Sequence, residues 1–245
     1  MKTLLAALVA WAALCVPALG ARLPAGQAVT PPPIAARAFI LVDALSGATL
    51  AAANESDRFE PASLTKLMTA YLVFQALREH RLDLAQEVNV SERAAQAGGA
   101  RMFLVAHQAV TVEQLLRGLL VASGNDAAVA LAEALSGSEA QFVARMNREA
   151  ARLGLADTHF TNASGAPAAG HHASARDIAA LTLAILRDFP ERYALFGQKE
   201  FAYNHVAQAN RNRLLWTDST VDGVASGFTE AAGYCLVASA RRGEG

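Results

Sequence analysis

The stretch EPASLTKLMTA, residues 60–70, decides how this chain is interpreted. It holds Lys66, one of only three lysines in 245 residues, in a segment that is otherwise mostly apolar. Ser63 precedes that lysine by three residues, and Pro61 just before it is typical of the start of a helix. If the helix begins at Ser63, the two side chains lie on one face and within reach of each other.

Residues 63–79 are apolar on nearly all faces, which predicts a buried central helix. A buried amine loses the solvation of its charge, so the pKa of Lys66 is expected to fall toward neutrality and to suit a general base. Serine is a weak nucleophile until a neighbouring base takes its proton. The Ser63-x-x-Lys66 pattern therefore predicts a nucleophile–base pair, and the helix N-terminus favours developing negative charge. The alternative is a helix cap followed by a surface lysine.

A second short pattern, VASGNDAA, contains Ser123 and Asn125. It lies between two segments with helical periodicity, 111–122 and 126–137, so one interpretation is an ordinary turn between helices. The functional interpretation joins it to the serine–lysine pair about sixty residues upstream. In that case the hydroxyl relays protons to the leaving group, and the amide orients the substrate and the lysine.

The remaining patterns place strands at both ends of the chain and helices between them. Two apolar runs around Ser46-Gly47 indicate a hairpin. Two further helices are expected, with caps at Ser138 and Ser174. The segments STVDGVASGFTE and AGYCLVASARR indicate strands near the C-terminus. This order predicts an α+β domain in which the terminal strands share an antiparallel sheet and the helices pack beside it.

The first twenty residues, MKTLLAALVAWAALCVPALG, have the composition of a secretory signal peptide with cleavage after Gly20. An uncleaved membrane anchor is the alternative, but the apolar run is shorter than the ~20 residues that a spanning helix needs. Residues 21–36 are rich in Pro, Ala and Gly and are predicted to be a flexible leader. The catalytic domain is then expected to span residues 37–245.

Composition argues against several classes of partner. The net charge is −1, and removal of the signal peptide makes it one unit more negative. There is no basic field for nucleic acid and no polybasic stretch for anionic lipid. Cleavage also leaves Cys235 as a lone cysteine, which is expected to pack as a small buried hydrophobe rather than to form a disulfide.

Six fragments resemble the exported serine D-alanyl-D-alanine carboxypeptidases, which are low-molecular-mass penicillin-binding proteins. They occur in that family's order between about residues 35 and 242, and their ordered set is far more specific than any one of them. The fragments are EPASLTKLMTAYL, TVEQLLRGLLVASGNDAAVALAE, NREAARLGLADTHFTNASG, SARDIAAL, NRNRLLW and VDG…GFTEAAGYCLVASA.

The resemblance implies the fold shared by penicillin-binding proteins and serine β-lactamases, here called the transpeptidase fold. It implies that Ser63 attacks the carbonyl between two terminal D-alanines of a peptidoglycan stem peptide and that Lys66 is the base. Ser123 and Asn125 complete the site, D-Ala leaves, and water releases the acyl-enzyme. Backbone N–H groups of Ser63 and Phe228 are expected to hold the oxyanion.

The same resemblance implies peptidoglycan stem peptides as substrates, β-lactams as covalent inhibitors, and no metal or organic cofactor. It places the protein in the periplasm or on the outer face of a bacterial cytoplasmic membrane. The pair His171-His172 resembles two metal ligands, but no third ligand has suitable spacing. We therefore expect these histidines to order a loop.

This sequence departs from the family at its third motif, Lys-Thr-Gly. Here Ala225-Ser226-Gly227 keeps a hydroxyl and the close backbone approach but lacks the ammonium that lies beside Ser123 in the family. Loss of a charged hydrogen bond in a buried site is worth roughly 1.5–3 kcal/mol, which is about ten- to a hundredfold in rate. Arg211 matches an arginine that helps hold the substrate's terminal carboxylate. With Ser226 it could still anchor that end, although it also suits a polar surface loop.

A second departure is the end of the chain, ARRGEG. Family members continue with another sheet strand, and usually with a β-rich second domain and an amphipathic membrane-attaching helix. Against that pattern we expect a C-terminally truncated catalytic domain, with that strand and the second domain missing. We also expect no membrane attachment encoded beyond the signal peptide.

Two other functions stay open. A β-lactamase or esterase on the same fold is one, but class A β-lactamases use a glutamate in an E-x-x-x-N loop, which we do not expect between Asn125 and Ala225. The other is a catalytically impaired homologue that binds peptidoglycan. Ala225 favours it, whereas the intact Ser63, Lys66, Ser123 and Asn125 argue against it.

Overall fold

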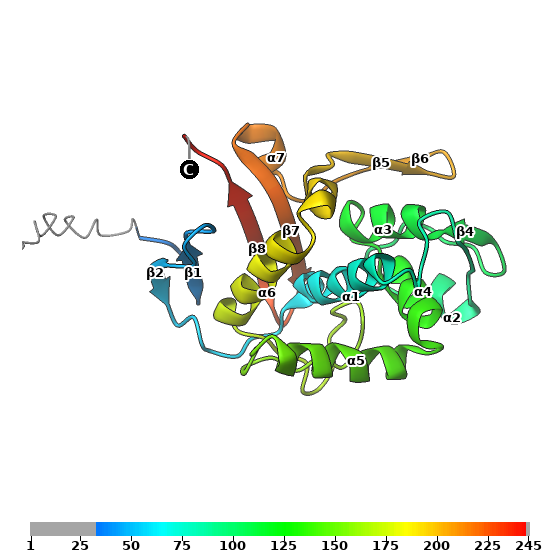
Figure 1. The fold of residues 1–245 in the computed structure, drawn as a ribbon, viewed down its shortest axis with the longest axis horizontal. Coiled ribbons are helices and arrows are strands. Elements are labelled where there is room, and N and C mark those ends of the chain that lie inside the picture. The colour runs from blue at the N-terminus through cyan, green and yellow to red at the C-terminus, as the bar shows by residue number, and fades with distance from the viewer. Residues whose placement is uncertain (1–32, 244–245) are drawn as a thin grey trace, which may run out of the picture. The chain divides into compact units, whose positions relative to one another are not determined.

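The computed structural model describes residues 33–243, which form the coloured ribbon in Figure 1. The predicted signal peptide (1–20) and most of the predicted leader (21–36) lie outside the described residues, and the division of the chain into these segments stays a prediction. From Ala35 onward the described residues form one compact unit. No helix among the residues that the structure describes combines the length and apolarity that a membrane crossing would require.

The helical elements follow one another between two regions of strands. In chain order they are η1 (Ala62–Thr65), α1 (Lys66–Arg78), α2 (Glu92–Ala95), α3 (Val112–Leu120), α4 (Asn125–Ser136), α5 (Glu139–Arg152), α6 (Ala175–Asp188), η2 (Pro190–Gly197) and α7 (Leu214–Thr217), of which η1 and η2 are 3-10 helices.

The strands of the described residues pair as four antiparallel hairpins or ribbons. They are β1 (Phe39–Val42) with β2 (Thr49–Ala53), β3 (Glu87–Asn89) with β4 (Ala109–Thr111), β5 (Glu200–Tyr203) with β6 (Val206–Ala209), and β7 (Val221–Thr229) with β8 (Gly233–Ala240).

Helix α1 lies at the centre of the structure because almost its whole surface is apolar. Every residue from Lys66 to Leu77 is buried except Gln75. Figure 1 shows α3, α4, α5 and α6 arranged around α1, and each of these four helices packs against it. The prediction of a buried central helix is thus confirmed, and the first turn of this helix is held at a fixed position inside the protein.

The predicted caps explain where two of the surrounding helices begin. The Ser138 hydroxyl accepts a hydrogen bond from the Gln141 amide at 3.3 Å, at the start of α5. The Ser174 hydroxyl accepts one from the Asp177 amide at 3.1 Å, at the start of α6. Each cap satisfies an N–H group that has no partner inside its own helix, so it fixes the start of that helix.

The expectation that the terminal strands share one sheet is wrong for the described residues. Strand β1 pairs with β2, whereas β7 pairs with β8, and the two ribbons belong to different sheets. Figure 1 shows the β1–β2 ribbon lying apart from β8, and β1 packs against α6 instead. Packing on a helix thus takes the place of backbone pairing with the last strands.

Cys235 on β8 is free and half-buried, and burial raises the pKa of its thiol.

Candidate active site

The serine and the lysine of the first motif meet because the chain enters α1 through a 3-10 turn. Such a turn has three residues per repeat, so side chains three positions apart lie in line. Nζ of Lys66 is 2.9 Å from Oγ of Ser63. The residue before the serine, Ala62, has φ +47°, a left-handed conformation that costs a non-glycine residue free energy. The surrounding packing therefore holds this turn in a strained shape.

The Lys66 amine is enclosed by protein and has three hydrogen-bond partners. The residue is 4% exposed. Besides Ser63, its Nζ contacts Oδ1 of Asn125 at 2.7 Å and the backbone oxygen of Ser164 at 2.8 Å. Burial lowers the pKa of Lys66 to about 7, with a further lowering by the positive charge of Arg211, while Asp126 acts in the opposite direction. The amine is therefore uncharged in a large fraction of molecules at neutral pH.

The partners also set the direction of the amine's lone pair. A charged Nζ donates to all three oxygens, but a neutral amine has only two N–H bonds and one lone pair. The amide oxygen of Asn125 and the backbone oxygen of Ser164 accept hydrogen bonds and have no hydrogen to give. They take the two N–H bonds, which leaves the lone pair facing the Ser63 hydroxyl. Ser164 could not be identified from the sequence, because it contributes a backbone atom.

The second motif stands at the bend between α3 and α4. Asn125 is the first residue of α4, and its Nδ2 donates to the Gly98 oxygen at 2.6 Å, which turns Oδ1 toward Lys66. Ser123 is buried, has φ +57° and lines the same cavity as Ser63. The predicted turn between helices is therefore present, and it also carries both polar side chains to the serine–lysine pair.

The neighbouring Asp126 was not identified from the sequence. Its carboxylate is fully buried and accepts hydrogen bonds from the amides of Met102 and Leu104, both at 3.0 Å. This fastens the loop before β4 to the start of α4 and places Gly98 on the other side of Asn125. An aspartate in the first turn of a helix is a common sequence feature, so the pattern alone does not indicate such an anchor.

The third motif forms the opposite side of the cavity, on β7. Ala225 and Ser226 line the cavity together with Ser63 and Ser123. A Cβ added to Gly227 would lie 2.7 Å from the Ser63 amide nitrogen, so only glycine lets the strand pass this close to the serine. All residues that line this cavity are Ser63, Lys66, Leu67, Leu119, Leu120, Val121, Ser123, Asn210, Arg211, Val224, Ala225 and Ser226.

The side chain of Phe228 does not line the cavity. It is 49% exposed and stacks on Tyr234 of β8, with ring centroids 4.7 Å apart. Phe228 can therefore contribute to the site through its backbone only, as expected from the sequence. Ala225 adds only a methyl group, so the charged residues that line the cavity, within the described part of the chain, are Lys66 and Arg211.

Arg211 reaches the cavity from a loop that two buried asparagines hold in place. Asn210 donates through Nδ2 to the Gln198 oxygen at 3.0 Å, and Asn212 donates through Nδ2 to the Gly223 oxygen at 2.8 Å. Both asparagines are buried, whereas the arginine between them is exposed. The alternation in NRNR therefore turns the amides inward and the guanidinium outward. It makes Arg211 a fixed positive charge at the mouth of the cavity.

The expectation that no E-x-x-x-N pattern lies between the second and third motifs is wrong for the spacing itself, which occurs at Glu200 and Asn204. These residues belong to the β5–β6 hairpin, which turns at Asn204 and His205, both with positive φ. Glu200 is exposed and does not line the cavity. This segment is therefore not a loop that presents a glutamate to the serine.

No group of three possible metal ligands occurs among residues 33–243.

The family model described as D-alanyl-D-alanine carboxypeptidase, peptidase S11, matches residues 25–245. The chain belongs to this peptidase family. It is 44% identical over 227 residues to the D-alanyl-D-alanine carboxypeptidase DacC of Escherichia coli, an alignment that covers 90% of this chain and 57% of the relative.

Solved structures of the peptidase family's relatives have the same fold. Penicillin-binding protein 5 from Haemophilus influenzae is 44% identical, with a TM-score of 0.85, over 87% of this chain and 63% of that one. Penicillin-binding protein D2 from Listeria monocytogenes, solved in a cefotaxime-bound form, is 28% identical with a TM-score of 0.79 over 87% of both chains. The predicted transpeptidase fold is confirmed. The chain spans little more than half the length of the curated relatives that it matches most strongly.

Proposed function

We propose that this member of the peptidase family is a serine-type D-Ala-D-Ala carboxypeptidase that acts through an acyl-enzyme on peptidoglycan stem peptides. The observation that carries the proposal is the 2.9 Å contact between a buried amine, whose pKa burial lowers to about 7, and the Ser63 hydroxyl. A serine needs a base of this kind to become a nucleophile at neutral pH. The family membership supplies the substrate class.

In the first step Ser63 Oγ attacks the carbonyl carbon of the terminal D-Ala-D-Ala bond. Its proton passes to the lone pair of Lys66, which Asn125 and Ser164 direct toward it. The carbonyl oxygen becomes an oxyanion, and the proposed donors are the backbone N–H groups of Ser63 and Phe228. The close approach of Gly227 to the Ser63 amide supports this pairing, because it sets both backbone segments side by side.

In the second step the C–N bond breaks and the leaving D-Ala nitrogen takes up a proton. We assign this relay to Ser123, which lines the cavity beside Ser63. Water then attacks the ester carbonyl and gives one proton to Lys66, the bond from the carbonyl carbon to Ser63 Oγ breaks, Oγ takes up that proton, and the shortened peptide leaves. Asn125 holds the amine throughout. No step of this scheme calls for a metal or an organic cofactor.

We assign binding of the substrate's terminal carboxylate to Arg211 and Ser226, both of which line the cavity. A guanidinium is suited to a carboxylate because it offers paired N–H donors in one plane. Ala225 leaves the strand side of the cavity without an ammonium group, so acylation is expected to be slower than with the usual lysine. β-Lactams are proposed as covalent inhibitors, in line with the cefotaxime-bound relative from Listeria. The protein is proposed to be exported, to the periplasm or the outer face of the membrane.

One other function has a specific observation in its favour. The methyl group of Ala225, where the family has an ammonium, is compatible with an impaired homologue that binds peptidoglycan without cleaving it. Against it stands the complete set of contacts around Lys66, which has no purpose in a protein that only binds. A β-lactamase is disfavoured because the residues that line the cavity include no glutamate.

The test is covalent capture of a labelled penicillin, followed by intact-protein mass spectrometry. Wild-type protein is expected to gain the mass of one penicillin, slowly and in one-to-one ratio. Ser63→Ala is expected to gain none, while Ser46→Ala, which deletes an exposed hydroxyl that does not line the cavity, serves as the control that still forms the adduct. Folded wild-type protein without any adduct would support the binding homologue, and rapid release of hydrolysed penicillin would support a β-lactamase.

A further inference from the structure

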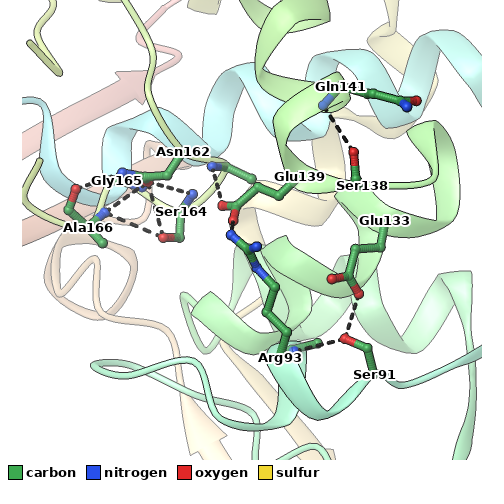
Figure 2. Close-up of polar contacts among 12 residues, drawn as sticks. Ser91, Arg93, Glu133, Ser138, Glu139, Gln141, Asn162, Ser164, Gly165 and Ala166 are labelled. Carbon is green, nitrogen blue, oxygen red and sulfur yellow. Dashed lines mark hydrogen bonds and ion pairs between the residues drawn. The ribbon is translucent and has the colours of Figure 1, made fainter.

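The backbone oxygen of Ser164 takes part in directing the Lys66 lone pair, so the loop that holds it matters. Oδ1 of Asn162 accepts hydrogen bonds from the amides of Ser164, Gly165 and Ala166 at 3.2, 2.7 and 3.1 Å. Figure 2 shows these three residues gathered around the Asn162 side chain. One side chain therefore sets the shape of this turn, but it does not set the position of the turn relative to α1.

Two contacts fasten the residue before this turn. Oε1 of the buried Glu139 on α5 accepts a hydrogen bond from the Ala163 amide at 3.0 Å, and its other oxygen pairs with Arg93. Figure 2 shows the Glu139 carboxylate between Arg93 and the loop. The Thr69 hydroxyl on α1 donates to the Ala163 oxygen at 2.7 Å. Both contacts act on Ala163, so the link between this loop and the turn that carries Ser63 and Lys66 needs a further support.

His171 supplies that link between the loop and the turn. It is 3% exposed, and its Nδ1 accepts a hydrogen bond from the Thr161 amide at 3.0 Å. An accepting Nδ1 carries no proton, so the hydrogen of the neutral ring lies on Nε2. Nε2 is 2.7 Å from the Thr65 hydroxyl oxygen and donates to it. The ring thus bridges the loop and the turn that carries Ser63 and Lys66.

The loop and that turn are in direct contact where the bridge joins them. A Cβ on Gly165 would collide with the backbone oxygen of Ala62 and would come within 2.8 Å of the Thr65 hydroxyl. There is no room for a water molecule between these backbones. If the bridge from His171 is lost, the turn at Gly165 is free to move off Ala62, and solvent reaches the Lys66 amine.

We propose that His171 is a positioning residue for the Lys66 base: by donating to Thr65 it keeps the Ser164 oxygen on the amine and water away from it. The catalytic part of this inference rests on the proposed acyl transfer. The positional part does not, because it concerns the charge state of one amine in the resting protein. Thr65 is the partner through which the ring acts.

The ring remains neutral over the range in which Lys66 titrates. Burial, and then the charges of His159 and His172, lower the pKa of His171 to about 4. The charges that act on Lys66 are those of Arg211 and Asp126. A titration between pH 5 and 10 therefore reports on the amine while the His171 ring keeps one protonation state.

The experiment uses the scarcity of lysine. Protein labelled with ¹³C at lysine Cε is titrated by NMR, and a Lys199→Arg variant assigns the signals. In wild-type protein the Lys66 signal is expected to titrate near pH 7. His171→Leu removes the donor at similar volume, and Thr65→Val removes its partner. Both are expected to move this midpoint upward, and the double variant to move it no further than either single one.

Conservative and neighbouring variants separate positioning from general support of the loop. His171→Gln and Thr65→Ser keep a donor and a hydroxyl, and both are expected to keep the midpoint near that of the wild type. His172→Leu is the matched control, because the His172 ring is hydrogen-bonded to the local Gly170 oxygen at 2.9 Å and not to Thr65. Thermal unfolding is measured for every variant, and the midpoint is compared only among variants that are folded at 25 °C.

Acylation by penicillin gives the second readout. For His171→Leu we expect the first-order acylation rate to fall by about tenfold or more, with the dissociation constant of the initial complex unchanged, because the base is misplaced rather than the substrate. A Lys66 midpoint that stays near 7 in folded His171→Leu and Thr65→Val overturns the proposal. If wild-type protein forms no adduct but the midpoint still moves, the proposed function fails while the positioning role stands.

Discussion

The two sides of the cavity are built by different means. One side, the helix wall, consists of Ser63, Lys66 and Ser123, and Asn125 supports it by binding the Lys66 amine. Side chains make these contacts at 2.7–2.9 Å in a buried setting. The other side, the strand wall, is Ala225–Phe228 on β7, where the backbone of a half-exposed ribbon makes the approach. We therefore expect side chains of the strand wall to modulate the rate as long as its backbone path is kept, whereas the helix wall supplies the nucleophile and the base themselves.

The largest expected effect tests the helix wall. Lys66→Met keeps most of the packing but removes the base, so the acylation rate is expected to fall by about 10²- to 10⁴-fold. The rate is measured from the growth of the penicillin adduct by mass spectrometry. Lys199→Met, which alters an exposed lysine, is the control and is expected to match the wild type. Equal rates for both variants would remove the amine from the mechanism and with it the contrast between the walls.

The next effect tests the backbone of the strand wall. Gly227→Ala adds a Cβ that would lie 2.7 Å from the Ser63 amide nitrogen, so β7 must move away from the serine. A displacement of about 1 Å near reacting atoms is expected to lower acylation on the order of 10²-fold. Gly98→Ala is the control, since its added Cβ would meet nothing within 4 Å. An unaffected rate in folded Gly227→Ala protein would show that the strand does not shape the oxyanion site.

A smaller effect, an increase in the acylation rate, is expected from changing a side chain of the strand wall. Ala225→Lys restores an ammonium facing the cavity and is expected to raise acylation about ten- to a hundredfold. Ala225→Met has similar length without charge and separates electrostatics from packing. If both variants gain equally, the missing feature is volume. If Ala225→Lys gains nothing, Arg211 or another group already supplies the charge.

The smallest effect concerns pH and the charge at the cavity mouth. Only the neutral amine accepts the serine proton, so acylation by the wild type is expected to rise with pH through about 7. The positive charge of Arg211 lowers the pKa of Lys66, so Arg211→Gln is expected to move this limb to higher pH. At neutral pH the loss is expected to be about fivefold, because an exposed charge is well screened. Arg213→Gln is the control, and a limb that stays in place would show that the two charges are not coupled.

The reactive side chains at the helix wall were predicted from the sequence far better than the backbone groups that support them. Ser63, Lys66, Ser123 and Asn125 were named because side-chain chemistry at short spacing is visible in a sequence. Ser164 was missed because its contribution is a backbone oxygen, and any residue offers one. The loop that contains it lies about a hundred residues from Lys66 along the chain, a separation that periodicity and spacing do not bridge.

In the fold, too, features set by residues close together in the sequence were predicted, whereas features set by long-range packing were not. Helix caps at Ser138 and Ser174 were predicted because the donor and acceptor are three residues apart. The β5–β6 hairpin was missed because its turn, Asn204-His205, adopts positive φ without the glycine that usually signals it. The hairpin of β1 and β2 was predicted correctly, whereas its expected place in one sheet with the last strands was wrong, since the association of distant segments depends on packing over long range.

The unequal setting of the two lysines among the described residues has a practical consequence. Lys199 is exposed just before β5, whereas Lys66 is enclosed by its neighbours. A bulky fluorescent ester that reacts with lysine side chains would therefore label Lys199 and leave the cavity unblocked. Such a dye would let ligand binding be followed by fluorescence on protein whose reactive centre is chemically untouched.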